Sequence, residues 1–109
     1  MEKTVKNKLV RDKIPQIIES QNYTCEYHLL TDIEYVKELK AKIIEEAKEL
    51  SEDYNLEELA DVYEVMLAIA NNLGYSLKDI EEKANLKRQR KGSFHNKVFL
   101  ESYQKNTDK

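Results

Sequence analysis

The stretch Leu59–Ala70 reads LADVYEVMLAIA and is apolar on almost every side when it is drawn as a helix. A helix of this kind is normally buried inside a bundle or at an oligomer interface. Asn55, followed three residues later by Glu58, is typical of a helix start, and Gly74 is typical of a helix end. The sequence therefore predicts one central helix between these signals.

A second long helix is predicted on the N-terminal side of this stretch. Thr31 and Glu34 have the spacing of a capping box, and the helix is expected to run to about Asp53. The apolar residues that recur with helical spacing are Val36, Leu39, Ile43, Ala47 and Leu50. Because only a short turn separates the two helices, we expect an antiparallel hairpin at the centre of the protein.

The remaining N-terminal part predicts shorter elements. Residues 8–15 (KLVRDKIP) are expected to be extended up to the proline, because the residue before proline is pushed out of the α region. Pro15 suits the first turn of a short helix over 15–21. Residues 22–30 alternate weakly, which is typical of a loop or of one short strand near 23–29.

The C-terminal part predicts a third long helix. Ser76 with Asp79 has the pattern of a helix start, and the helix is expected to end in a basic turn before Gly92. A final short helix is a candidate for residues 94–103, and residues 105–109 are expected to fray.

The composition favours an all-α fold in a single domain over residues 1–109. With 2 Gly and 1 Pro, the chain has little material for the turns of a β-sandwich or barrel. Charged residues make up 36% of the chain, a high load for a small domain. Because such a domain gains core by self-association, we expect a helical bundle completed by oligomerisation, as a homodimer or homotetramer.

The net charge, the cysteine count and the length of the apolar runs also disfavour several classes of function. A net charge of −3 gives no global attraction to nucleic acid or to anionic lipid. Cys25 is the only cysteine, which excludes an intrachain disulfide and a cysteine-based zinc cluster. No apolar run approaches the roughly 20 residues that span a bilayer, and the N-terminus lacks a signal-peptide core. We expect a cytoplasmic protein without a membrane partner.

Acidic residues are dense along the predicted hairpin. Between Glu45 and Glu64 there are nine acids against one base, Lys48. Two pairs have helical spacing and lie near the turn that joins the antiparallel helices, so their carboxylates can converge: Glu46, Glu49, Glu58 and Asp61. Carboxylates held this close repel each other unless a cation neutralises them. A hard divalent ion with oxygen ligands, Mg²⁺ or in its place Mn²⁺, fits this arrangement.

Each acid also has a simpler explanation. Glu58 doubles as the capping partner of Asn55, and most of the other acids fit a solvated helix face. Glu46 and Asp61 carry the metal hypothesis, because both stand where an apolar residue would stabilise the fold more. No histidine lies within helical reach of the acids, which argues against a di-iron site.

A basic turn ends the third predicted helix. Residues 83–91 contain five bases and no acid. Cations at a helix C-terminus are favoured by the helix dipole, which is one explanation of the turn. A phosphate clamp opposite the acidic hairpin is the functional alternative. A nucleic-acid patch is disfavoured, since no aromatic residue interleaves with the bases.

Three blocks of the sequence resemble a known family. They are residues 8–15 (KLVRDKIP), the acidic pairs Glu45-Glu46-x-x-Glu49 with Glu58-x-x-Asp61, and residues 91–94 (KGSF). In this order they resemble the all-α nucleotide pyrophosphohydrolases, which include MazG-like and phosphoribosyl-ATP pyrophosphohydrolase-like proteins. The N-terminal block is most similar to the second branch. Ser93 departs from that branch, which usually has a second glycine after Gly92.

The resemblance implies Mg²⁺-dependent hydrolysis of a nucleoside triphosphate between its α- and β-phosphates. The metal ligands would be Glu46, Glu49, Glu58 and Asp61. Glu45 and Glu49 would position the attacking water as catalytic residues. The candidates to bind phosphate are Lys8, Arg11, Arg88 and Lys91. Two alternatives stay open at this point: a non-catalytic helical interaction module, and a nucleotide sensor without turnover.

Overall fold

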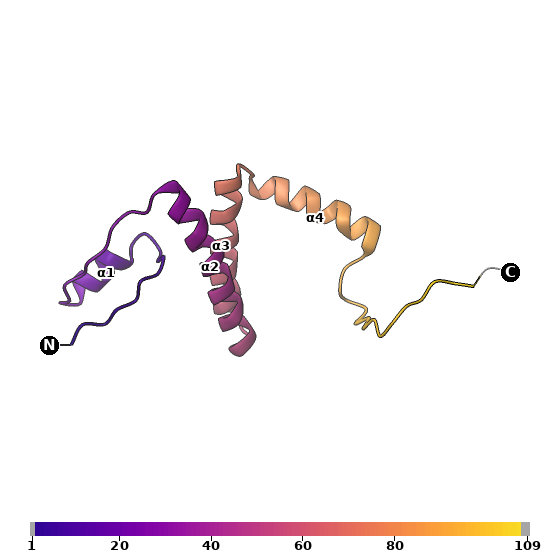
Figure 1. The fold of residues 1–109 in the computed structure, drawn as a ribbon, viewed down its shortest axis with the longest axis horizontal. Helices are drawn as coiled ribbons and strands as arrows, with labels where there is room; N and C mark the ends of the chain where they lie inside the picture. The colour runs from indigo at the N-terminus through magenta and orange to yellow at the C-terminus, as the bar shows by residue number, and fades with distance from the viewer. Residues whose placement is uncertain (1, 108–109) are drawn as a thin grey trace. The chain divides into compact units, whose positions relative to one another are not determined.

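The computed structural model describes residues 2–107, and its regular structure is entirely helical (Figure 1). The helices are α1 (Ile14–Ser20), α2 (Asp32–Glu52), α3 (Leu56–Leu73) and α4 (Leu77–Lys91). The described residues contain no strand, so the loop alternative for residues 22–30 is correct and the strand near 23–29 is not formed. The predicted all-α class is confirmed. By their internal contacts the residues form two units, one up to Leu77 and one from Lys78 on, and each is described by itself.

Helices α2 and α3 form the hairpin that the sequence predicts. They lie side by side and are the one pair among the described helices with extensive contact (Figure 1). Leu39 of α2 is buried between them, together with Val65 and Ala70 of α3. The core of the hairpin is therefore a thin line of apolar side chains along its length.

The start of α2 is a complete capping box. The Thr31 hydroxyl accepts a hydrogen bond from the Glu34 N–H at 3.2 Å, and the Glu34 carboxylate accepts one from the Thr31 N–H at 3.0 Å. These two bonds satisfy backbone donors that the first turn of a helix leaves free. The helix ends at Glu52, with Asp53 as its C-cap, which agrees with the predicted end.

The start of α3 has only half of the predicted box. The Asn55 side chain accepts a hydrogen bond from the Glu58 N–H at 2.9 Å, and the reciprocal bond to the Glu58 carboxylate is not formed between these two described residues. The helix ends at Leu73, and its C-cap, Gly74, has a left-handed φ of +86° that suits a residue without a side chain. Glu58 therefore does not use its carboxylate as a cap.

The expectation that residues 8–15 stay extended up to the proline is wrong. Asp12 and Lys13 form a turn, and the Ile14 N–H donates to the Arg11 carbonyl at 3.0 Å. Helix α1 begins at Ile14, so Pro15 takes the second helical position, where a missing N–H removes no intrahelical bond. The restriction on the residue before proline is a bias, and the early turn overrides it.

The unit from Lys78 on consists of most of α4 and the chain after it. Helix α4 begins directly after Ser76 and ends at Lys91, and Gly92 follows with a φ of +84°. The candidate helix over residues 94–103 is not formed. A short helix depends on packing of an apolar face, and Phe94 and Phe99 are exposed in the structure.

Candidate metal centre

Three of the four predicted metal ligands come together on the hairpin. Glu46, Glu58 and Asp61 each offer one carboxylate oxygen, and these oxygens lie within 4.8 Å of one another. Glu46 stands in the last two turns of α2, whereas Glu58 and Asp61 stand in the first two turns of α3. Because α2 and α3 are antiparallel, these turns face each other, as the spacing of the acids predicts.

Glu46 is the buried member of this acidic cluster. Its exposed fraction is 8%, and it is the one buried charged residue among those that the structure describes. Its Oε1 lies 3.4 Å from the Lys42 ammonium, while its Oε2 is buried without a hydrogen-bond partner. Burial raises the pKa of Glu46, and the charges of Glu49 and Asp61 raise it further against the effect of Lys42.

Glu58 adds a second orphaned oxygen to the cluster. Its Oε2 is also buried without a partner. Desolvation raises the pKa of Glu58, followed by the charges of Glu49 and Asp61. A buried acceptor is nearly always satisfied in a native protein, so two orphaned carboxylate oxygens in one cluster call for a donor or a cation. The donor set is all oxygen, which suits a hard divalent ion such as Mg²⁺.

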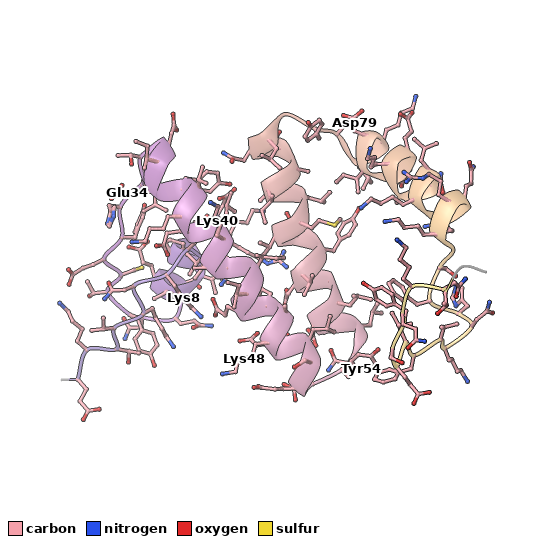
Figure 2. All side chains as sticks on the ribbon, turned by 45° about the vertical axis from the view of Figure 1, so that its right-hand side comes forward. Lys8, Glu34, Lys40, Lys48, Tyr54 and Asp79 are labelled. Carbon is pink, nitrogen blue, oxygen red and sulfur yellow. The ribbon has the colours of Figure 1, made fainter. Side chains whose placement is uncertain are left out.

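The N-terminal segment brings two cations to the same end of the hairpin. The Lys8 ammonium lies 2.7 Å from Glu45 Oε1, and the Arg11 guanidinium lies 2.7 Å from Asp61 Oδ1. Figure 2 shows Lys8 on the N-terminal segment beside α2. The hydrogen bond to Lys8 lowers the pKa of Glu45, and the same bond raises the pKa of Lys8. Two of the four predicted phosphate-binding residues therefore lie against the acids.

Glu49 does not join the cluster of three. Its carboxylate is outside the group of oxygens that lie within 4.8 Å of one another. Its charge nevertheless raises the pKa of Glu46 and of Glu58, so it contributes to the field around them. A role for Glu49 as a ligand stays a prediction, and so does its role in positioning water.

Lys42 is a residue of this site that the sequence analysis missed. Its ammonium lies 3.3 Å from Glu45 Oε2 and 3.4 Å from Glu46 Oε1, and its side chain is 14% exposed. A signal for it exists, because Lys42 stands three and four residues before these two acids on one helix face. Lys42 lies just before the acidic stretch from Glu45 to Glu64, so the density of acids in that stretch did not indicate it.

The other two predicted phosphate-binding residues belong to the C-terminal unit. Arg88 and Lys91 are exposed and stand in the last turn of α4, where they meet the carbonyl end of the helix. Arg88 donates a hydrogen bond to the Asn85 side chain. Their part in phosphate binding stays a prediction.

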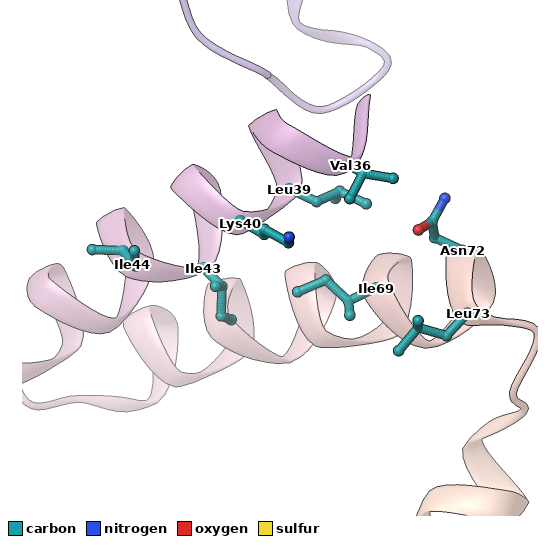
Figure 3. A pocket seen from close by; sticks show the side chains of 8 residues that line it. All are labelled: Val36, Leu39, Lys40, Ile43, Ile44, Ile69, Asn72 and Leu73. Atoms are coloured by element: carbon teal, nitrogen blue, oxygen red, sulfur yellow. The ribbon is translucent and has the colours of Figure 1, made fainter. Parts of the chain in front are cut away.

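A groove opens at the other end of the hairpin, away from the acids. It has a volume of about 400 Å³. Figure 3 shows Leu39 and Ile43 of α2 facing Ile69 of α3 across it. The eight residues that line the groove are Val36, Leu39, Lys40, Ile43, Ile44, Ile69, Asn72 and Leu73. Of these, Ile44 and Leu73 are 70% and 64% exposed, so the hairpin presents open apolar surface there.

Comparisons with protein-family models, with curated proteins and with solved structures give no match for this chain. Within the part of the chain that the structure describes, no helix has both the length and the apolar character needed to cross a membrane. What the structure establishes is a helical hairpin that carries an acidic cluster at one end and an open apolar groove at the other.

Proposed function

We propose that this protein is a Mg²⁺-dependent nucleotide pyrophosphohydrolase, which cleaves a nucleoside triphosphate between its α- and β-phosphates. One observation carries the proposal: the acidic cluster of Glu46, Glu58 and Asp61 has two buried carboxylate oxygens without partners. Lys8 and Arg11 stand beside it as cations for phosphate oxygens. The resemblance of the sequence to all-α nucleotide pyrophosphohydrolases supports the same reaction.

The proposed chemistry divides among residues of the hairpin and the N-terminal segment. Mg²⁺, when bound, supplies charge neutralisation on the phosphate oxygens. Glu46, Glu58 and Asp61 would hold it, with Glu49 as the predicted fourth ligand. The oxygen of a water molecule attacks the α-phosphorus, and the bond from that phosphorus to the bridging oxygen of the β-phosphate breaks.

Glu45 and Glu49 are the proposed residues for the water. The hydrogen bond from Lys8, followed by that from Lys42, lowers the pKa of Glu45, and its carboxylate can accept a hydrogen bond from the water. The proton that the water loses passes to a carboxylate, for which Glu45 is the first candidate and Glu49 the second. The pyrophosphate leaving group carries negative charge, which Lys8, Arg11, Arg88 and Lys91 are proposed to stabilise.

The apolar groove supports the expected homo-oligomer. Exposed apolar side chains on a helix pair are normally covered by a further helix layer, and a second hairpin of the same chain supplies one. Ile44 and Leu73, both more than half exposed, would be buried in such a four-helix arrangement. A homodimer or homotetramer is therefore part of the proposal.

A screen for pyrophosphate release tests the function directly. The full chain is incubated with Mg²⁺ and with canonical and modified nucleoside triphosphates, and pyrophosphate and monophosphate are measured. We expect turnover with at least one substrate, and a loss of about 100-fold or more in Glu46→Ala and Asp61→Ala. Glu64→Ala removes an exposed acid from the same helix as Asp61 and is the matched control, with near-normal turnover. Full Mg²⁺-dependent hydrolysis by both cluster variants would show that the proposed mechanism is wrong.

A nucleotide sensor without turnover is the second candidate. It is favoured by the pairing of Asp61 with Arg11 and of Glu46 with Lys42, because these cations already offset part of the charge in the cluster. The discriminating result is a rise in the thermal unfolding midpoint with Mg²⁺ and a non-hydrolysable nucleotide, combined with no release of pyrophosphate in the screen.

A further inference from the structure

Ion pairs join the N-terminal segment, residues 2–13, to the hairpin. Among the described residues, its two ion pairs to the hairpin are Lys8 with Glu45 and Arg11 with Asp61, both at 2.7 Å. Leu9 and Val10 are half-buried, and the helix that follows, α1, has no buried residue. The segment is therefore held both by these half-buried side chains and by the two ion pairs, and a change at either ion pair alters its attachment.

The two ion pairs differ in one respect. Asp61 belongs to the acidic cluster, whereas Glu45 does not. The Arg11 guanidinium thus uses a carboxylate that a metal ion would also use, while the Lys8 ammonium uses a carboxylate outside the cluster. A divalent cation at the cluster and the guanidinium on Asp61 repel each other, and they compete for the same negative charge.

The cluster itself has an independent feature that points to a cation. Glu46 is more than nine-tenths buried, and its Oε2 has no partner although its Oε1 faces Lys42. Arg11 therefore leaves the cluster incompletely neutralised: it pairs with Asp61 and reaches neither orphaned oxygen, on Glu46 or on Glu58.

We infer that Arg11 is a built-in counter-ion of the acidic cluster, and that a divalent cation displaces it from Asp61 and loosens the attachment of the N-terminal segment around Arg11. This inference rests on the metal site of the proposed function and adds its regulation. By linkage, the effect runs both ways: the cation weakens attachment of the segment, and attachment of the segment weakens binding of the cation by the same factor. Once released from Asp61, Arg11 is free to meet an anionic substrate beside the cation.

The test measures binding of Mn²⁺ alone to the full chain, from the paramagnetic resonance signal of the free ion. Removal of the charge in Arg11→Met is expected to raise the affinity for Mn²⁺ about fivefold or more, which lies in the usual range of coupling between sites. Lys8→Met is the matched control, because it breaks an ion pair of equal length outside the cluster, and its affinity is expected to rise less. Arg11→Lys keeps the charge and is expected to restore an affinity close to that of the unaltered protein.

A second measurement follows the segment itself by amide hydrogen exchange. In the unaltered protein, saturating Mn²⁺ is expected to speed exchange of the Ile14 amide, which donates to the Arg11 carbonyl at 3.0 Å. In Arg11→Met the Ile14 amide is expected to exchange quickly without Mn²⁺ and to change little when it is added.

The outcomes separate this inference from the proposed function. If the unaltered protein binds Mn²⁺ and Arg11→Met binds it equally or more weakly, Arg11 does not compete and the inference is overturned, while the metal centre stands. If neither protein binds Mn²⁺, both the metal centre and the inference are overturned. Binding to Arg11→Met alone supports both, since it shows a site that the guanidinium masks.

Discussion

The two ends of the α2–α3 hairpin differ in the kind of side chains that face each other between the helices. Near the turn that joins α2 to α3, the facing positions hold Glu46, Glu58 and Asp61. Further along the same two helices, the facing positions hold Leu39 and Ile69, which line an open apolar groove (Figure 3). The same antiparallel geometry thus brings carboxylates together at one end and apolar side chains together at the other.

The difference separates the part of the hairpin that stabilises the fold from the part that carries buried charge. At the apolar end, contact between side chains removes surface from water and stabilises the hairpin. At the acidic end, burial of Glu46 and of one oxygen of Glu58 opposes folding until something neutralises them. The apolar contacts therefore stabilise the hairpin against the cost of the buried carboxylates. A bound cation would remove that cost.

The largest effect on this comparison is expected from the buried residue at the apolar end. Leu39 is 3% exposed, and Leu39→Ala is expected to lower the free energy of unfolding by about 3 kcal/mol, because it removes buried methyl groups and leaves a cavity. Urea unfolding followed by circular dichroism measures this loss.

Ile44→Ala is the control for that prediction. Ile44 lines the same groove but is 70% exposed in the chain, so its truncation is expected to cost well under half as much at low protein concentration. If a second copy covers the groove, Ile44→Ala weakens self-association in sedimentation experiments. Equal losses from both variants at all concentrations would show that the groove is closed within one chain.

A smaller effect is expected where α2 begins, far from the acidic cluster. Thr31→Ala removes one half of the capping box and is expected to lower the free energy of unfolding by about 1 kcal/mol. Thr31→Ser keeps the hydroxyl and should keep most of that stability. Because Thr31 lies away from the acids, Mn²⁺ binding should not change in either variant, and a change there would mean that the two ends are coupled.

The smallest effect, and the one of opposite sign, is expected at the acidic end. Without a divalent cation, Glu58→Gln is expected to raise the midpoint of thermal unfolding at neutral pH, because it replaces a carboxylate whose buried oxygen has no partner. Glu57→Gln removes an exposed acid from the same helical turn and is the control, with no gain. With saturating Mg²⁺ the order should reverse, since Glu58→Gln loses a proposed ligand.

The pH dependence of stability is a second test of the prediction for Glu58→Gln. The pKa of Glu46 and of Glu58 is raised above its ordinary value of 4.5, so their protonation stabilises the folded state, and that contribution is lost as pH rises through the folded-state pKa. The pKa of Glu34 and of Glu45 is lowered, so their contribution is present above 4.5 and is lost as pH falls below it. In the metal-free protein we expect stability to rise as pH falls from neutral toward about 4.5 and to fall below that. Glu58→Gln should reduce the gain in stability between neutral pH and about 4.5. An unchanged pH profile in that variant would contradict the raised pKa of Glu58.

The sequence by itself determined the helices of the hairpin and the acids that meet on it. The Thr31–Glu34 box, the Asn55 cap and the Gly74 stop are local signals, and each sets a helix end through bonds between residues a few positions apart. Helical spacing and an antiparallel turn then predict which acids converge, because both are fixed by the geometry of the backbone. Local rules failed at residues 8–15 and 94–103, where a weak preference was overridden or an apolar face had no packing.

Only the tertiary structure decided which charges meet. Arg11 pairs with Asp61 across 50 positions, and Lys8 pairs with Glu45 across 37, and no local pattern specifies either contact. The tertiary structure also decided that the Glu58 carboxylate joins the cluster instead of capping the Asn55 N–H, and that Glu49 lies outside the group of three. The physical reason is that ion pairing and desolvation depend on distances between segments, whereas helix formation depends on neighbours along the chain.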